Sequence, residues 1–226
     1  MLNKTCGILG LIPANNEAEH IVDVVTGVRA YLPVVVVDDG SVDNTAYLAE
    51  WAGAQVLRQV PNQGKGFALR TGFREALASN YKAIITLDAD GQHDPAEIPK
   101  FIKVYTNHHC DLIIGARNFR KIPMVRRMAN RIGQVAFSWA MGKTIPDNQS
   151  GYRLISRRLM EVLLVSKEEG FEFEVEMIVT CLRQGFIIDW VPIRTIYAGE
   201  NSHIHPWHHT VNFFRMVLHA RRTMRP

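Results

Sequence analysis

The sequence contains few cysteines and no long apolar run, and each shortage excludes a class of protein. Its 226 residues include three cysteines, Cys6, Cys110 and Cys181, which are far apart and show no CxxC spacing. A small disulfide-stapled fold is therefore excluded, and we expect three reduced thiols packed in a core. No stretch of about 18 uncharged apolar residues occurs, so we expect no membrane-spanning helix. The first residues also lack the basic and apolar regions of a signal peptide.

Neither sign of charge dominates the chain as a whole. Lys and Arg number 26 against 22 Asp and Glu, a formal net charge of +4, and 47% of the residues are hydrophobic. This composition is that of a globular protein, and it excludes a disordered or collagen-like chain. So small a basic excess does not indicate a nucleic-acid partner, and we expect none.

The basic residues are concentrated in two segments that contain no acidic residue. Seven of them lie between Asp111 and Asp147, and four follow Glu200. Large apolar residues such as Trp139 and Trp207 are interspersed among them. This mixture predicts amphipathic helices that lie on an anionic membrane surface. The alternative is a solvated face over an ordinary core.

Apolar runs alternate with helical patterns along the first half of the chain. Strands are expected near 6–12, 34–37, 54–57, 83–87 and 112–115, and helices near 17–31, 44–51, 66–78 and 95–105. This alternation predicts an α/β fold with a mostly parallel sheet in three layers. In the second half we expect amphipathic helices within 117–142, strands near 150–156 and 186–197, a helix near 172–184 and an amphipathic C-terminal helix from 206. We expect a single domain over 1–226.

Polar and acidic segments follow three of the expected strands, at 13–17, 38–41 and 88–92. The carboxyl ends of parallel strands meet at one edge of a sheet, where ligands of such folds bind. Strand alternation places Asp88 and Asp90 on the same side. Two close carboxylates favour a divalent cation, and hard oxygen ligands suit Mg²⁺ or Mn²⁺. Gln92 adds a neutral oxygen, and Asp43 is expected to cap the following helix.

The segment 62–66, Asn-Gln-Gly-Lys-Gly, precedes an expected helix and suits a phosphate group. Neither familiar phosphate motif fits, because Gln59 and Gly66 break the P-loop pattern and Leu69 breaks the dinucleotide fingerprint. A plain turn with a solvated lysine remains the alternative.

Four of these motifs together resemble a known family. Pro-Ala-x-Asn-Glu, Val-Asp-Asp-Gly-Ser, Asn-x-Gly-Lys-Gly and Asp-Ala-Asp-Gly-Gln occur in the order and spacing of family-2 glycosyltransferases. The branch that they resemble is the dolichol-phosphate mannosyltransferase-like, or polyprenyl-phosphate glycosyltransferase, branch. The likeness continues through 115–117, 147–153, 191–193 and the segment around Ser202.

This resemblance implies an inverting, metal-dependent enzyme of the GT-A fold. The donor would be a GDP- or UDP-hexose, and residues 1–116 or so would form the donor and metal half. By family analogy the donor contacts are Pro13, Asn15, Glu17, Asp39, Lys65, Asp88 and Ala89. The metal ligands would be Asp90 and Gln92, with Asp88 nearby. The family often carries Tyr at position 15 and Lys at position 203, where Asn and His stand here. The Gln-x-x-Arg-Trp signature of processive synthases is absent.

The half from about 117 onwards would meet the acceptor and the membrane. A polyprenyl phosphate is already anionic at neutral pH, so its attack needs no general base. Guanidinium groups bind phosphate in a bidentate manner. Arg117, Arg127 and Arg131 are the candidates, with Arg153 as a fourth. A sugar hydroxyl acceptor would instead need a carboxylate base. The choices are Asp147 and Glu174, of which Glu174 could simply lie on an exposed helix face.

We therefore expect a cytoplasmic enzyme that is peripherally bound to the membrane, alone or through a membrane-anchored partner protein. A glycan-directed transferase and a catalytically inactive sugar-nucleotide-binding protein are the alternatives, and a nucleotidyltransferase is a distant third. The histidines at 203, 205, 208 and 209 are expected to pack at the interface rather than bind zinc.

Overall fold

The computed structural model describes residues 7–117, 134–165, 173–194, 196 and 221. The strands are β1 (Ile8–Ala14), β2 (Val34–Asp39), β3 (Gln55–Gln59), β4 (Ala83–Thr86), β5 (Leu112–Arg117), β6 (Arg153–Ser156) and β7 (Ile188–Ile193). The helices are α1 (Ile21–Arg29), α2 (Thr45–Trp51), α3 (Lys65–Ala78), the 3₁₀ turn η2 (Pro95–Glu97), α4 (Ile98–His108), α6 (Arg157–Leu163) and α7 (Phe173–Arg183). Residues 134–141 are also helical.

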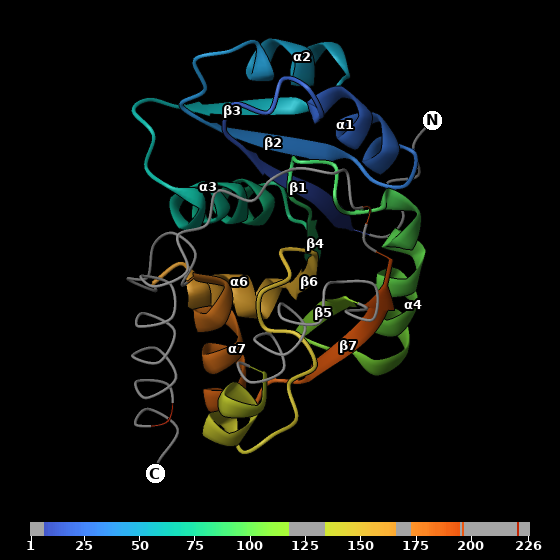
Figure 1. The fold of residues 1–226 in the computed structure, drawn as a ribbon, viewed down its shortest axis with the longest axis vertical. Helices are drawn as coiled ribbons and strands as arrows, with labels where there is room; N and C mark the ends of the chain where they lie inside the picture. Colours follow the sequence, from blue (N-terminus) through green and yellow to red (C-terminus); the bar gives the residue numbers. More distant parts are fainter. Residues whose placement is uncertain (1–6, 118–133, 166–172, 195, 197–220, 222–226) are drawn as a thin grey trace.

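The strands form one seven-stranded sheet in the order β3-β2-β1-β4-β6-β5-β7 (Figure 1). Four neighbouring strands, β3, β2, β1 and β4, are parallel as predicted, and β7 pairs parallel with β5. Only β6 runs antiparallel to its neighbours, β4 and β5. The prediction of a mostly parallel α/β sheet is confirmed.

Helices cover both faces of the sheet, which explains the continuous apolar strands. On β1, Leu9 and Leu11 face a core shared with α3, α6 and α7. Ile8 and Ile12 face the other core, which α1, α2 and α4 close. Burial of each strand on both faces makes its sequence read as an unbroken apolar run. In the described part of the chain, no helix has the length and apolarity needed to cross a bilayer.

Apart from Arg221, the predicted C-terminal helix from 206 lies outside the described residues, as does most of the predicted 117–142 segment. Cys110 and Cys181 are buried free thiols, as expected, whereas Cys6 is outside the described part. Burial raises the pKa of both described thiols. The Cys110 thiol lies within 4.8 Å of ligand atoms of His108 and Asp189, at the opposite sheet edge from the acidic loops.

Candidate active site at the strand ends

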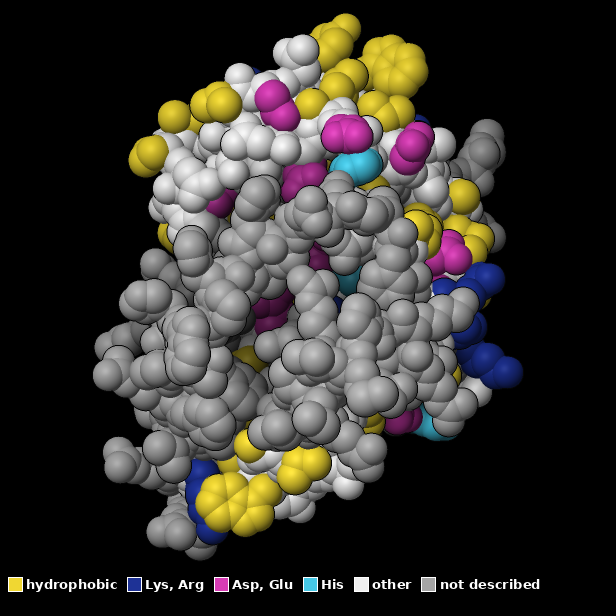
Figure 2. Space-filling model, in the orientation of Figure 1, with side chains coloured by type: hydrophobic (Ala, Val, Ile, Leu, Met, Phe, Trp, Pro, Cys, Tyr) yellow, Lys and Arg dark blue, Asp and Glu magenta, His cyan; other side chains and the backbone are white. Residues whose placement is uncertain are grey.

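The polar segments after β1 and β2 come together at the carboxyl edge of the sheet. The Asn15 side chain donates to the Asp39 carbonyl at 2.8 Å, and the Glu17 N–H donates to Thr45 Oγ1 at 2.8 Å. Asp43 accepts the N–H groups of Thr45 and Ala18 and so ties the two segments together. The N-cap residue of α2 is Asn44, so the prediction that Asp43 caps this helix is wrong by one residue. In Figure 2 several acidic side chains lie on the upper part of this face, over the region of α1, α2 and β1–β3 in Figure 1.

Asp39 fixes the loop that leads into α3. Its Oδ1 accepts the Gln63 N–H at 2.8 Å and the Gln59 side-chain N–H at 2.9 Å, and its Oδ2 accepts the Gly64 N–H at 2.7 Å. The carboxylate is buried, and these bonds place Lys65 as the first residue of α3. Sequence reasoning assigned Asp39 to the donor. The structure gives it a loop-holding role, and the donor contact stays a prediction.

Asp88 is enclosed by three neighbours from distant parts of the chain. Lys65 Nζ lies 2.6 Å from its Oδ1, and His93 Nδ1 lies 3.9 Å from its Oδ2. Gly151 packs so closely that a Cβ there would sit 2.4 Å from Oδ2. The His93 ring accepts the Asp88 backbone N–H at 3.1 Å through Nδ1, so in this arrangement it is the neutral form with its proton on Nε2.

The charges of this cluster stabilise one another. Burial acts to raise the pKa of Asp88, but the Lys65 ammonium outweighs it and lowers that pKa to about 2. Burial likewise acts to lower the pKa of Lys65, but Asp88 and Glu174 outweigh it and raise that pKa above its ordinary value. Asp88 is therefore ionised and Lys65 charged at neutral pH.

Asp90 and Gln92 offer oxygen atoms that fit a divalent metal. Asp90 is half-buried, and its Oδ1 accepts the Gln92 N–H at 3.0 Å. Its Oδ2 accepts no hydrogen bond within the described part of the chain, so a carboxylate oxygen is open there. A carboxylate and an amide oxygen are hard ligands of the kind that Mg²⁺ and Mn²⁺ take. Of the predicted set, Asp90 and Gln92 are thus the residues that could contact such an ion.

Arg117 is clamped by Asp147 at the same edge. Its Nε and Nη2 donate to the two carboxylate oxygens at 2.7 and 3.1 Å, and Asp147 also accepts the N–H groups of Gln149 and Ser150. Asp147 is buried, while a quarter of the Arg117 side chain is exposed. The two residues were predicted separately. Their pairing means that Asp147 orients a guanidinium rather than standing free as a base.

Arg153 does not lie where the sequence analysis placed it. We expected it to contact phosphate, yet it is fully buried and donates to the carbonyls of Asn148, Ser150 and Glu174. It therefore fastens the loop before β6 to the start of α7, and the phosphate assignment is wrong because no surface of the guanidinium is left. Burial lowers its pKa from the ordinary arginine value.

Glu174 differs from the expected exposed position as well. It is buried in the first turn of α7, and its Oε1 lies 2.6 Å from Lys65 Nζ. Sequence reasoning missed this link and the contact of Gly151 with Asp88. The Ser-Gly dipeptide at 150–151, inside a motif already singled out, was the one available signal for the latter.

The remaining predicted residues fall into two groups. Pro13 and Ala89 are buried beside the edge, Pro13 in register with Val37 of β2. Arg127 and Arg131 lie outside the described residues.

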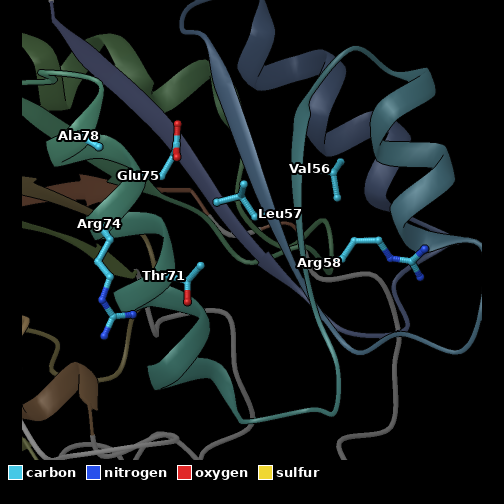
Figure 3. Close-up of a pocket in the computed structure, with 7 residues that line it drawn as sticks. All are labelled: Val56, Leu57, Arg58, Thr71, Arg74, Glu75 and Ala78. Carbon is cyan, nitrogen blue, oxygen red and sulfur yellow. The ribbon is translucent and has the colours of Figure 1, made fainter.

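A separate groove runs along the flank of the molecule between β3 and α3 (Figure 3). Its lining includes Leu57, Thr71 and Arg74, and it has a volume of about 560 Å³. None of the predicted site residues lines it, so it is distinct from the strand-end site.

Comparison with known proteins identifies related sequences and folds. Residues 11–164 match the family described as "Glycosyl transferase family 2". The undecaprenyl-phosphate mannosyltransferase of Micrococcus luteus is 30% identical over 82% of this chain and 82% of its own length. The UDP-N-acetylglucosamine--dolichyl-phosphate N-acetylglucosaminyltransferase of Methanococcus voltae is 28% identical over 83% and 85%.

A solved structure shares the fold. Glucosyl-3-phosphoglycerate synthase from Mycobacterium tuberculosis, in complex with Mn²⁺, UDP and phosphoglyceric acid, superposes with a TM-score of 0.74. The match covers 97% of this chain and 79% of the other, at 19% identity. The expected GT-A fold is thereby confirmed.

Proposed function

The chain belongs to glycosyltransferase family 2, and on that premise we propose that it transfers a hexose from a nucleotide diphosphate sugar to a polyprenyl phosphate. The enzyme class follows from the family. The lipid acceptor, the cytoplasmic membrane face and the use of a divalent metal are our proposal. Two relatives whose names include undecaprenyl phosphate and dolichyl phosphate support the choice of acceptor.

The observation that carries the proposal is the Arg117 guanidinium, which Asp147 orients at the same sheet edge as the acidic pair Asp88 and Asp90. A buried carboxylate orients it through two hydrogen bonds, and a quarter of the side chain is exposed. Arginine held in this way suits a phosphate oxyanion. Arg127 and Arg131 remain predicted partners in the same role.

The reaction follows from the charge of the acceptor. An acceptor phosphate oxygen attacks the anomeric carbon and forms the new C–O bond, while the bond from that carbon to the nucleoside diphosphate breaks and the diphosphate leaves with the electron pair. The attack occurs opposite the leaving group, so the configuration inverts. Arg117 screens the incoming phosphate from the donor diphosphate and orients it in line.

On the donor side, Pro13, Asn15, Glu17, Asp39 and Ala89 are proposed to line the nucleotide, as the family resemblance implies. A Mg²⁺ or Mn²⁺ ion held by Asp90 and Gln92 would neutralise the charge of the leaving diphosphate.

A sugar hydroxyl acceptor is the second reading, and the surroundings of the two candidate bases disfavour it. Asp147 is occupied by the Arg117 guanidinium and three backbone N–H groups, and Glu174 by Lys65. A general base must reach the proton that it removes. Neither carboxylate is free to do so.

We further propose that the two basic segments hold the protein on the membrane. The two segments contact each other through one residue from each. The Arg221 guanidinium stacks 3.2 Å from the ring centroid of Trp139, and the Trp139 side chain is largely exposed. A basic and aromatic surface of this kind suits an anionic lipid interface.

A transfer assay tests the function. The protein is incubated with labelled GDP- and UDP-hexoses, Mn²⁺ or Mg²⁺, and one of three acceptors: polyprenyl phosphate, the matching polyprenol, or free sugars. We expect product only when polyprenyl phosphate is the acceptor, and a large loss of the transfer rate in Arg117→Ala. Product with sugars only would overturn the lipid proposal. Binding without turnover in every mixture would favour an inactive sugar-nucleotide-binding protein.

A further inference from the structure

Lys65 is built into the site by three elements. Its Nζ lies 2.6 Å from Asp88 Oδ1 and 2.6 Å from Glu174 Oε1. Asp39 fixes the loop from which α3 starts at Lys65, and Glu174 is buried in the first turn of α7. The ammonium is therefore held in place from both sides, unlike a surface lysine that samples solvent.

The two carboxylates of the acidic pair are consequently not equivalent. Asp88 has one oxygen on Lys65 and the other packed against Gly151 and His93. Asp90 binds only the Gln92 N–H within the described part of the chain, and its second oxygen is open. A cation that approaches the pair thus meets one available carboxylate and one that an ammonium already neutralises.

We propose that Lys65 is a positioning residue that makes metal binding at the acidic pair depend on the nucleotide. This inference rests on the proposed function. A divalent ion alone is repelled by the ammonium and lacks the Asp88 ligand, so it binds weakly. A nucleoside diphosphate brings oxygen ligands and negative charge that offset Lys65, so the ion and the nucleotide each strengthen the binding of the other. The enzyme then holds its metal chiefly when the donor is bound.

Glu174 gives this proposal a discriminating variant. Removal of its charge leaves the ammonium to Asp88 alone, so the obstacle to a free cation stays in place. Removal of Lys65 instead frees Asp88 Oδ1 and takes a positive charge away from the pair. Of two variants that break the same ion cluster, only the one at Lys65 is therefore expected to tighten the binding of a free cation.

The test is the binding of Mn²⁺, followed by the electron paramagnetic resonance signal of the free ion, with and without UDP or GDP. Lys65→Met is expected to bind Mn²⁺ alone about tenfold more tightly than the unaltered protein. The gain in Mn²⁺ affinity on adding nucleotide is expected to shrink in that variant. Glu174→Gln is not expected to tighten binding. Arg74→Met, which removes one positive charge from the exposed groove side of α3 (Figure 3), should match the unaltered protein.

The proposal is overturned if Lys65→Met binds Mn²⁺ alone no more tightly, or if Glu174→Gln tightens binding equally. Circular dichroism checks the fold. Should Lys65→Met not fold, Lys65→Gln, which keeps a donor between the two carboxylates, carries the same comparison. Failure of the proposed function shows separately, as absent transfer by the unaltered protein, and leaves the Mn²⁺ comparison interpretable.

Discussion

At the scale of single residues, Asp90 has one carboxylate oxygen that accepts no hydrogen bond within the described part of the chain. Asp90→Ala removes the carboxylate that is proposed to hold the metal, so we expect turnover to fall by about a thousandfold or more. The fold should persist, because Asp90 makes one hydrogen bond to its own turn. Transfer rates measure the effect, and Glu50→Ala on the exposed face of α2 serves as the control. Undiminished turnover in Asp90→Ala would remove the metal assignment.

Gly151 sets how closely the loop before β6 approaches Asp88. Because a Cβ there would lie 2.4 Å from Asp88 Oδ2, Gly151→Ala must displace the carboxylate or the loop. We expect a loss of activity of about a hundredfold, measured as transfer rate.

Gly142 offers a matched control for that change. Its φ is +64° and no atom lies near the Cβ position, so Gly142→Ala should cost about 1 kcal/mol of unfolding free energy through backbone strain and leave activity unchanged. Equal activity losses in the two variants would contradict the close-contact explanation.

The roles of some single residues could not be predicted from the sequence. Asp90 and Arg117 could be predicted because an acidic residue directly after a strand, or an isolated arginine, can be recognised from the sequence alone. Arg153 and Lys65 could not be placed, since each has a partner 21 or more residues away and burial decides their roles. The sequence names charged groups but does not show which of them neutralise one another.

At the scale of elements, Asp111 joins the starts of β5, α6 and β7. Its carboxylate accepts from Ser156 Oγ, from Arg158 Nε and Nη2, and from the Ile187 N–H. Burial acts to raise the pKa of Asp111, but these hydrogen bonds outweigh it and hold the pKa below 3.8. The folded state thus favours the ionised form, and the stabilisation is present above the unfolded value and lost as the pH falls through the lower folded pKa.

Asp111→Asn is therefore expected to lower the unfolding free energy at neutral pH by about 2 kcal/mol. Its stability should also fall less steeply than that of the unaltered protein below pH 3.8. Urea unfolding at a series of pH values measures both effects. Asp23→Asn on the exposed face of α1 is the control, and a pH profile that is identical in all three proteins would refute the linkage.

Most elements were predictable because their burial is periodic. The apolar runs of β1, β2 and β4 and the amphipathic α3 and α4 lie within a few residues of the predicted bounds. Helix α6 was missed because it begins directly at the end of β6, where Ser156 caps it without an intervening loop. The reversed direction of β6 was also not foreseen, since strand direction depends on pairing with partners far along the chain.

At the scale of the whole molecule, the small net charge conceals a division. The two acid-free segments carry eleven basic residues, so the rest of the chain is acidic overall. We expect binding to vesicles that contain anionic lipid, weakening as salt screens the attraction. Co-sedimentation across a salt series measures it, with neutral phosphatidylcholine vesicles as the control. Equal binding to vesicles with and without anionic lipid would contradict the proposed membrane surface.

The antiparallel direction of β6 constrains the chain that connects it to β5. β5 ends and β6 begins at the same edge, where Ile114 pairs with Arg153 and Arg117 grips Asp147. The chain between them therefore leaves the sheet and returns to it at the ends of two adjacent strands. A replacement for this chain must therefore begin and end at this edge and must also supply the core contacts of Phe137, Met141 and Ile145.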